Sequence, residues 1–309
     1  MKVYLSIEEF KTDKKTAVTT GTFDGAHTGH KVVIDQLKNA AKKIDGESVI
    51  LTFFPHPRMV LYPDDHELRL LNTIEERITL LEKSGIDHLI VHPFSKEFSR
   101  LSSTEYVRDI LVNKLNVSTL VIGYDHQFGK NREGSFKDLQ ELAPLYDFNV
   151  EEIEAQKIKQ VNISSTKVRN SLLTGNVQAA NQFLGYHYFI KGNVVTGDKI
   201  GRSIGFPTAN IKPSEWYKLI PAAGVYAVKV KLEGLIFNGM LNIGNRPTIN
   251  DTNEQTIEVN IFNFDKDIYN KEIEIEFYER VRDEQKFENI TKLQQQLEID
   301  KQNIVQIFS

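Results

Sequence analysis

The chain has 309 residues, of which 40% are hydrophobic and 26% charged, and its formal net charge is −4. This length exceeds the usual size of one domain, so we expect two. The negative charge argues against a broad nucleic-acid-binding surface, and no apolar run reaches membrane-spanning length. The chain contains no cysteine, which excludes disulfides, thiolate metal sites and cysteine nucleophiles. The first five residues lack the apolar core of a signal peptide, and we expect a cytoplasmic protein.

The first part of the chain, to about Leu184, alternates short apolar strands with helical patterns. This alternation predicts a mostly parallel sheet with helices on both faces. Strands are expected at residues 16–20, 48–54, 88–91 and 119–122. Helices are expected at residues 32–44, 73–83, 106–115 (after a capping box at 102–105), 168–173 and 177–184, with Gly175 and Gly185 as C-caps.

Residues 21–30, Gly-Thr-Phe-Asp-Gly-Ala-His-Thr-Gly-His, join the first of these strands to the first helix. Glycines let the backbone approach an anion, and a helix N-terminus offers N–H groups and a positive dipole end. His27 and His30 can donate hydrogen bonds to phosphoryl oxygens and, if protonated, offset negative charge there. Taken singly, each histidine is more often an ordinary solvent-facing residue. As His-x-Gly-His at a strand-to-helix turn, the pair indicates nucleotidyl transfer.

Further candidate residues follow later strands, at the edge of the sheet where ligands gather. Pro55-His56-Pro57 ends the strand at 48–54, and Asp125 and Phe128 follow the strand at 119–122. A fourth cluster is Ser164-Ser165-Thr166-Lys167-Val168-Arg169. Serines at a helix start are N-caps by default, but these hydroxyls and cations would also suit a polyphosphate tail.

After Gly185 strand-like alternation takes over, and we predict domains at residues 1–185 and 186–309. Strands are expected at residues 188–195, 225–232, 235–243, 257–262 and 273–278. A terminal helix follows, capped at Asn289, with an apolar stripe of Ile290, Leu293, Leu297 and Ile304. Short antiparallel strands with one helix suggest a small barrel.

Residues 197–210 of the second domain carry Gly197, Gly201 and Gly205 at a spacing of four. This loop is suited to folding over phosphates, although it is neither a Walker A nor a GxGxxG sequence, and a flexible hairpin explains it equally well. Thr208 and Asn210 are either turn residues or oxygen ligands to Mg²⁺. Glu258 interrupts an apolar run, as either an outward-facing strand residue or a general base.

Together these motifs resemble the prokaryotic bifunctional riboflavin kinase/FAD synthetase family over nearly the whole chain. Residues 21–30 look like its Gly-x-Phe-Asp-Gly-x-His-x-Gly-His turn, and residues 52–57 like its Thr-Phe-x-Pro-His-Pro segment. Residues 164–169 match its Ser-Ser-Thr-x-x-Arg motif and residues 205–210 its Gly-Phe-Pro-Thr-Ala-Asn signature. Residues 242–248 and 282–287 also resemble segments of its kinase half. The pairing of the histidine turn with the 205–210 signature makes the resemblance specific.

The resemblance implies a Rossmann-like nucleotidyltransferase domain followed by a small antiparallel riboflavin kinase barrel. The barrel would phosphorylate riboflavin with ATP to give FMN. The first domain would then adenylylate FMN with a second ATP to give FAD and pyrophosphate. Mg²⁺ is the implied cofactor, the partners are these small molecules, and no nucleic-acid or membrane partner is expected.

The resemblance also implies roles for single residues. His27, His30 and Arg169 would be catalytic in the first domain, and Glu258 would be the general base of the kinase. Further ATP contacts in the first domain would come from Gly21, Phe23, Asp24, Ser164, Ser165 and Thr166. Its FMN or nucleotide pocket would be lined by Pro55, His56, Pro57, Asp125 and Phe128. In the kinase, Thr208 and Asn210 would hold Mg-ATP, and further contacts would come from Gly197, Lys199, Gly201, Gly205, Pro207 and Arg282.

Two departures and two alternatives accompany this interpretation. His126 stands where many relatives have phenylalanine, and Thr22 where asparagine is commoner.

A different His-x-Gly-His adenylyltransferase, of the pantetheine-phosphate or nicotinamide mononucleotide type, would explain residues 21–30 equally well, but it would not explain residues 205–210 and Glu258. A barrel that binds nucleic acid or senses flavin would need a basic stripe among its aromatic residues. Acidic residues surround those aromatics instead: Asp265, Asp267, Glu272, Glu274 and Glu276.

Overall fold

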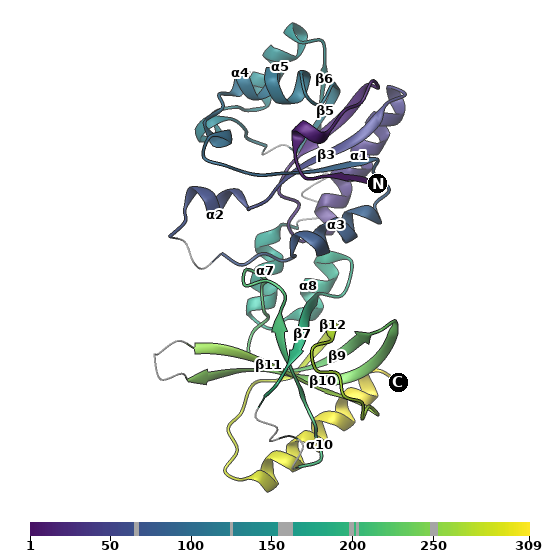
Figure 1. Cartoon of the computed structure of the whole chain (residues 1–309), viewed down its shortest axis with the longest axis vertical. Helices are drawn as coiled ribbons and strands as arrows, with labels where there is room; N and C mark the ends of the chain where they lie inside the picture. Colours follow the sequence, from purple (N-terminus) through teal and green to yellow (C-terminus); the bar gives the residue numbers. More distant parts are fainter. Residues whose placement is uncertain (65–67, 124–125, 154–162, 198–200, 202–203, 248–252) are drawn as a thin grey trace. The chain divides into compact units, whose positions relative to one another are not determined.

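The computed structural model describes residues 1–64, 68–123, 126–153, 163–197, 201, 204–247 and 253–309, with backbone alone at 245–247 and 253–254. The chain divides into two compact units, Met1–Ser165 and Thr166–Ser309 (Figure 1). Each unit is described by itself.

The first unit is built on a six-stranded sheet in the order β1-β4-β3-β2-β5-β6. Its strands are, from β1 to β6, Lys2–Tyr4, Thr16–Thr20, Glu47–Phe53, His88–His92, Val117–Gly123 and Asn149–Ile153. All neighbouring pairs are parallel, as predicted. Because β3 lies on one side of β2 and β5 on the other, the strand order reverses at β2. Ligands of such sheets bind at this reversal, beyond the carboxyl ends of the strands.

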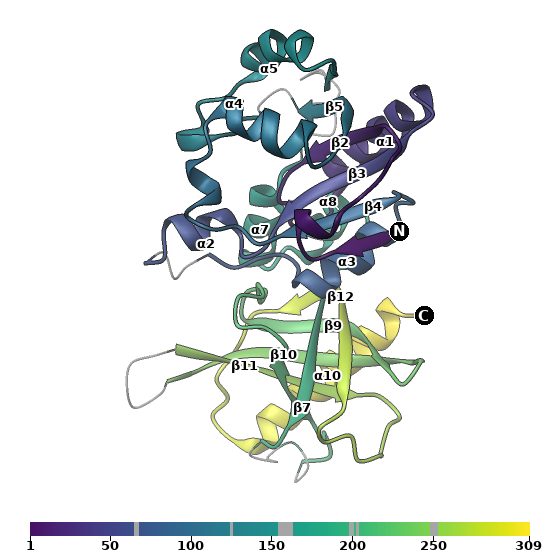
Figure 2. The ribbon, with the colours of Figure 1, turned by 45° about the horizontal axis from the view of Figure 1, so that its top comes forward.

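Helices cover both faces of this sheet, which confirms the predicted fold class (Figure 2). Helices α1 (Thr28–Lys43) and α3 (Ile74–Glu82) pack on one face, and the π-helix Tyr106–Val112 and α5 (Phe136–Leu142) pack on the other. Neighbouring strand residues alternate between the faces, with Ala17, Ile50 and Leu89 under α1 and Val18, Leu51 and Ile90 opposite. The remaining short helices are Ile7–Glu9, Pro57–Leu61 (α2), Phe98–Arg100, Ser103–Glu105 (α4), Lys130–Arg132 and Ala143–Leu145.

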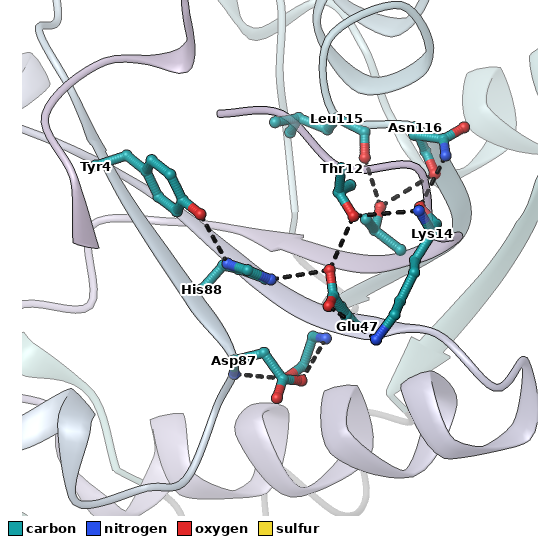
Figure 3. Close-up of polar contacts among 10 residues, drawn as sticks. Tyr4, Thr12, Lys14, Glu47, Asp87, His88, Leu115 and Asn116 are labelled. Carbon is teal, nitrogen blue, oxygen red and sulfur yellow. Dashed lines mark hydrogen bonds and ion pairs between the residues drawn. The ribbon is translucent and has the colours of Figure 1, made fainter. Parts of the chain in front are cut away.

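A polar cluster lies where β3 and β4 begin (Figure 3). Glu47 Oε2 accepts hydrogen bonds from His88 Nε2 at 3.0 Å and Thr12 Oγ1 at 2.9 Å, and its Oε1 lies 3.2 Å from Lys14 Nζ. The Tyr4 hydroxyl is 3.2 Å from His88 Nδ1, so the cluster ties β1 to both strands. Burial would raise the pKa of the Glu47 carboxyl, but the bonds from Thr12, Lys14 and His88 together outweigh it and lower the pKa to about 2.

We expect Glu47→Gln to destabilise the first unit by roughly 1–2 kcal/mol at pH 7, because it removes charge-assisted hydrogen bonds. Since folding lowers the pKa of Glu47 from 4.5 to about 2, its contribution is present above pH 4.5 and lost as the pH falls toward 2. Urea midpoints of wild type and variant should therefore differ at pH 7 and converge as the pH approaches 2. Glu141→Gln, exposed on α5, is the control. Equal midpoints at pH 7 would contradict this account.

The second unit contains a closed barrel of antiparallel strands in the order β10-β11-β8-β7-β12-β9, which confirms the predicted barrel. The strands are, from β7 to β12, Phe189–Val195, Ala209–Pro213, Gly224–Leu232, Leu235–Pro247, Asn253–Ile261 and Glu272–Arg282. Glu233 and Gly234, with φ of 51° and 80°, form the predicted turn between β9 and β10. β8 was not predicted from the sequence.

Helix α10 (Ile290–Ile307) packs against the barrel through the buried Ile304 and the partly buried Leu293 and Leu297. Asn289 caps it, as predicted, by accepting a hydrogen bond from the Lys292 backbone N–H at 2.9 Å. The prediction that Ile290 belongs to the buried stripe is wrong, because 59% of this residue is exposed. It is the first residue of the helix and lies outside the apolar cluster.

Helices α7 (Ser165–Leu173) and α8 (Val177–Leu184) precede the barrel. The structural division falls at the start of α7, earlier than the predicted boundary at residues 185/186. Hydrogen bonds to the barrel unit explain the difference. The Ala222 N–H donates to the Leu172 carbonyl at 3.0 Å, and Asn181 Nδ2 donates to the Phe277 carbonyl at 2.9 Å. Both helices therefore pack with the barrel, although their sequence continues the pattern of the first unit.

Candidate active sites

The turn at residues 21–30 follows the carboxyl end of β2 and has an unusual backbone conformation. Phe23 and Ala26 have φ of 48° and 38°, in the left-handed region that non-glycine residues rarely occupy, and Gly25 has φ of 88°. Such strained conformations persist only where the surrounding structure holds them in place. They are common at active sites and ligand-binding turns. The turn then runs directly into α1, whose first residue is Thr28.

The two histidines of the turn lie face to face. Their ring centroids are 3.7 Å apart with planes inclined by 13°. His27 caps α1, because its Nδ1 accepts a hydrogen bond from the His30 backbone N–H at 3.3 Å. With Nδ1 as acceptor, the proton of a neutral His27 ring belongs on Nε2.

His30 is neutral in the free protein. Burial lowers the pKa of its imidazole well below the usual 6.5, and the nearby His27 and Arg77 lower it further. Within the part of the chain that the structure describes, its Nδ1 is buried without a hydrogen-bond partner. The neutral His30 ring therefore offers an N–H donor, rather than a positive charge, to an incoming phosphate.

Asp24 holds the turn rather than facing outward. Its carboxylate is fully buried and accepts hydrogen bonds from the backbone N–H groups of Leu71 at 3.0 Å and Asn72 at 3.3 Å. Arg77 Nη2 lies 3.8 Å from the same carboxylate. The side chain predicted to contact ATP is thus engaged with the segment before α3, so we assign its carboxylate to the architecture of the turn.

The histidine turn meets the start of the Ser-Ser-Thr-x-x-Arg motif. Ser165 Oγ donates a hydrogen bond to the Asp24 carbonyl at 2.8 Å. A Cβ built on Gly29 would lie 3.0 Å from His27 Nδ1 and 3.1 Å from the Ile163 carbonyl, so only glycine admits this approach without displacing a neighbour. Two predicted motifs that are distant in sequence are therefore adjacent here. Thr166 and Arg169 follow on α7.

We expect Gly29→Ala to reduce the rate of adenylyl transfer about tenfold, because the added methyl group displaces His27 or Ile163. Alanine favours the helix over glycine by about 1 kcal/mol, so the variant should keep its stability. FAD formation from FMN and the thermal midpoint are the measurements. Gly85→Ala, where only Lys38 Nζ lies within 4 Å of the new methyl group, at 3.5 Å, should keep its activity. Full activity in Gly29→Ala would contradict this role of Gly29.

The other residues predicted for the first site occupy varied positions. Phe23 and Phe128 are buried, at 3% and 7% exposure, in the apolar clusters on opposite faces of the sheet, so most of each ring packs in the core.

His56, between Pro55 and Pro57, caps α2 by accepting a hydrogen bond from the Arg58 backbone N–H at 3.2 Å. Gly21 lies against the Phe23 ring. Asp125 falls outside the described residues. The ring of His126, the residue that departs from the family pattern, stacks near Phe128 with centroids 6.0 Å apart.

In the barrel, β8 and β11 bring three predicted residues together. Glu258 lies opposite Asn210 in the register of these strands. Thr208, just before β8, donates a hydrogen bond from Oγ1 to Glu258 Oε2 at 3.3 Å. Glu258 is half-buried. A carboxylate, a hydroxyl and an amide therefore lie at one place on the barrel.

Two glycines of the preceding loop approach these side chains closely. A Cβ on Gly197 would lie 2.0 Å from Asn210 Nδ2, and one on Gly201 would lie 3.4 Å from Thr208 Oγ1 and 2.2 Å from the Phe206 carbonyl. The glycines are therefore required for contact between the loop and the cluster. Gly205 has φ of 82° and open space around it. Lys199 lies outside the residues that the structure describes.

A pocket of about 460 Å³ opens beside this cluster. Its lining includes Val194, Pro207, Thr208, Val259, Phe264 and Tyr269. This volume and the mixture of apolar walls with a few polar groups are typical of small-molecule sites. Thr208 lines this pocket and also donates a hydrogen bond to Glu258, which is itself not among the lining residues.

Sequence reasoning missed Asn260, which is 7% exposed and donates from Nδ2 to the Pro207 carbonyl at 2.7 Å. It fixes the backbone immediately before Thr208. A signal was present in the sequence, because Glu258 and Asn260 are two residues apart and so lie on the same face of the strand, alternating with the apolar Ile257, Val259 and Ile261.

Arg282, predicted to contact ATP or flavin, has a protein partner. Its Nη2 lies 2.8 Å from Asp300 Oδ2 and its Nε donates to the same oxygen at 2.9 Å. Asp300 is 1% exposed and also accepts from Gln296 Nε2 at 2.9 Å. The guanidinium thus ties the end of β12 to α10, and its contact with a substrate stays a prediction.

Comparison with known proteins covers both units. Residues 9–167 match the FAD synthetase family model and residues 184–308 the riboflavin kinase family model. The chain is similar to the bifunctional riboflavin kinase/FMN adenylyltransferases of Bacillus subtilis (39% identity over 96% of this chain and 93% of that protein) and Listeria monocytogenes (40%, over 96% and 94%). The corresponding protein of Escherichia coli K12 is 33% identical, over 94% of this chain and 92% of its own length.

A crystal structure described as a macrolide-efflux protein from Streptococcus pneumoniae is also similar, with a TM-score of 0.86 and 31% identity over 97% of both chains. Among the helices that the structure describes, none is long and apolar enough to cross a membrane. Family models match both units, and the curated relatives span almost the full length of the chain. The chain therefore belongs to the family of bifunctional riboflavin kinase/FMN adenylyltransferases.

Proposed function

We propose that this chain carries out both reactions named for its family, each in its own unit. Riboflavin is phosphorylated by ATP to FMN in the barrel, and FMN is adenylylated by a second ATP to FAD in the first unit. The observation that carries this proposal is the presence, in separate units, of two clusters with different chemistry. One offers two stacked imidazoles at a helix N-terminus, and the other offers a half-buried carboxylate beside a hydroxyl and an amide.

The first cluster suits attack by an ionised nucleophile. The phosphate of FMN has a second pKa of about 6 and needs no base at neutral pH. Its oxygen attacks the α-phosphorus of ATP, the bond to the β-phosphate oxygen breaks, and pyrophosphate leaves. His27 and His30 would donate hydrogen bonds to the transferring group, and the N-terminus of α1 would add its dipole. Ser164, Ser165, Thr166 and Arg169 would bind the departing β- and γ-phosphates.

The second cluster suits attack by a neutral hydroxyl. The ribityl 5′-hydroxyl of riboflavin must lose a proton as its oxygen attacks the γ-phosphorus of ATP. The bond between that phosphorus and the β-phosphate oxygen breaks, and ADP leaves. Glu258 would accept that proton, and the Thr208 hydroxyl, which donates to its Oε2, would orient the carboxylate. The pocket beside Thr208 would hold the nucleotide, with the loop glycines Gly197, Gly201 and Gly205 near its phosphates. This difference in nucleophile explains why one site needs a carboxylate base and the other does not.

We propose that the second cluster binds Mg²⁺. It prefers oxygen ligands, and Thr208 and Asn210 offer a hydroxyl and an amide oxygen, which the phosphate oxygens of ATP would complement. When bound, the metal ion neutralises charge on the transferring phosphate. Glu258, opposite Asn210 in the barrel, would remain the group that accepts the proton.

Two separate assays test the proposal. Riboflavin with Mg-ATP should give FMN and then FAD, and FMN with Mg-ATP should give FAD without ADP formation. Flavins are separated by HPLC, and pyrophosphate and ADP are measured independently. A protein that makes FMN and never FAD would overturn the proposal for the first unit, and one that leaves riboflavin unchanged would overturn it for the barrel.

A further inference from the structure

We propose that Arg77, a buried arginine of α3, is a positioning residue for adenylyl transfer, which acts on the histidine turn through the carboxylate of Asp24. The inference rests on the proposed reaction at His27 and His30. All four residues belong to the first unit, Met1–Ser165. Because Arg77 is fully buried, its charge does not face solvent, and its effect on the reaction passes through its neighbours.

Arg77 is one of two fully buried charged residues on α3. The buried residues of this helix are Glu76, Arg77 and Leu81. Glu76 belongs to the capping box, in which its carboxylate accepts a hydrogen bond from the Thr73 backbone N–H at 3.0 Å. Arginine is almost never fully buried unless it is paired, and replacing a buried ion pair by apolar residues is often neutral or stabilising. Stability of the fold is therefore a weak reason for arginine at this position.

The pairing of Arg77 leads to the histidine turn. Its Nη2 lies 3.8 Å from Asp24 Oδ1, and both side chains are only 1% exposed. The same carboxylate accepts hydrogen bonds from the Leu71 and Asn72 backbone N–H groups, and the carbonyl of Asp24 accepts one from Ser165 Oγ. Asp24 stands between two residues with φ of 48° and 88°. Arg77 therefore balances the charge of the group that holds the strained part of the turn.

The charge of Arg77 also acts on His30. Burial is the main cause that lowers the pKa of His30, and His27 and Arg77 lower it further. The titratable and charged groups on the turn and on the buried face of α3 are His27, Asp24, Glu76 and Arg77, and the two carboxylates accept hydrogen bonds from backbone N–H groups. A positive charge beside an imidazole disfavours its protonated form. Arg77 thus helps to keep His30 a neutral donor while its pair with Asp24 holds the turn in place.

The test measures two quantities in the full-length Arg77→Met variant. The kcat for FAD formation from FMN should fall about tenfold, because small displacements of catalytic groups slow the reaction. In the free protein, the midpoint at which the His30 ring titrates should rise toward 6.5, because a positive charge is lost while burial remains. NMR of the histidine Cε1–H groups follows this titration, and His30→Gln identifies the signal. An unchanged kcat, or a fall in kcat without a change in the titration of His30, would overturn the inference.

Further substitutions keep the test decisive. Arg77→Lys retains the positive charge, so it should titrate His30 as in wild type and recover part of kcat. If Arg77→Met does not fold, Arg77→Gln, which still offers an N–H donor to Asp24 without a charge, is judged by the same two quantities. Arg108→Met is the control, because it removes an exposed arginine of the same unit that pairs with Asp109. The kcat for riboflavin phosphorylation should stay within about twofold of wild type in all of these variants.

Thr52→Val separates displacement of the turn from loss of charge. Thr52 is fully buried, and its Oγ1 donates a hydrogen bond to the Thr22 carbonyl at 3.1 Å. Valine has a similar shape but cannot form this bond, so the variant should lower kcat for FAD formation and leave the titration of His30 unchanged. A rise in the His30 midpoint equal to that in Arg77→Met would overturn the inference, because displacement alone would then explain both variants.

His30→Ala distinguishes this inference from the proposed function on which it rests. If His30→Ala forms FAD at the wild-type rate, the proposed site itself fails. If His30→Ala loses FAD formation and Arg77→Met keeps it in full, the role of Arg77 alone fails.

Discussion

His30→Ala should reduce FAD formation from FMN by about 10²–10³-fold, the usual effect of removing one donor that stabilises charge in a transition state. Riboflavin phosphorylation by the same protein should continue at the wild-type rate, so FMN should accumulate when riboflavin is supplied. The expectation follows from the position of His30 in the first turn of α1, stacked on His27 with centroids 3.7 Å apart. Initial rates of FAD formation at saturating FMN and ATP are the measurement.

The protonation state of His30 sharpens this experiment. Because burial and its neighbours keep the pKa of the ring well below 6.5, His30 acts as a neutral donor in the free protein. His30→Gln, which keeps an N–H donor of similar reach, should therefore retain more activity than His30→Ala. His187→Ala is the control, since this ring stacks on Tyr278 in the barrel unit. If His30→Ala forms FAD at the wild-type rate, the assignment of the first site is wrong.

Glu258→Gln should reduce riboflavin phosphorylation by about 10²–10⁴-fold, the range expected when a general base is removed. Glutamine preserves the volume of the side chain and can still accept a hydrogen bond from Thr208, but it cannot take up the proton of the ribityl hydroxyl. FAD formation from added FMN should be unaffected, because that reaction occurs in the other unit. The decisive quantity is kcat for FMN formation at saturating riboflavin and ATP.

Glu272→Gln is the matched control for this change. Glu272 is exposed at the start of β12, and its substitution should leave both activities intact. An unchanged kcat with a raised KM in Glu258→Gln would show that Glu258 binds substrate without acting as a base. That outcome would contradict the proposed chemistry of the barrel.

Much of the first unit could be predicted because its strands are apolar and its motifs lie at strand ends. The strands at 16–20 and 119–122 are continuous buried runs, and the residues that follow them reach the same edge of a parallel sheet. The terminal strands β1 and β6 escaped prediction, since Lys2–Tyr4 and Asn149–Ile153 are short and rich in charged or polar residues. Such edge strands form through pairing with a neighbour rather than from their own pattern.

β8 escaped prediction for a different reason. Ala209–Pro213 has no apolar alternation, follows Pro207, and ends in a second proline. Its strand conformation depends on pairing with β7 and β11, which are distant in sequence. The sequence singled out Thr208, Asn210 and Glu258, but only the register of β8 and β11 shows that they lie together.

Side-chain direction was the least predictable feature of the candidate sites. A motif aspartate and a motif arginine suggest contact with ligand, yet Asp24 accepts backbone hydrogen bonds from Leu71 and Asn72, and Arg282 pairs with Asp300. Their partners lie on segments that no local pattern links to the motifs. Conversely, the contacts of Ser165 and Gly29 place the start of the Ser-Ser-Thr-x-x-Arg motif beside the histidine turn.

The most direct test of two independent sites is to mix the two inactive variants, His30→Ala and Glu258→Gln, with riboflavin and Mg-ATP and to follow flavins by HPLC. Alone, His30→Ala should stop at FMN, and Glu258→Gln should leave riboflavin unchanged. Together they should make FAD after a lag, because FMN released by the first variant is adenylylated by the second. Failure of the mixture to form FAD, or loss of both activities in either single variant, would contradict the assignment of one reaction to each unit.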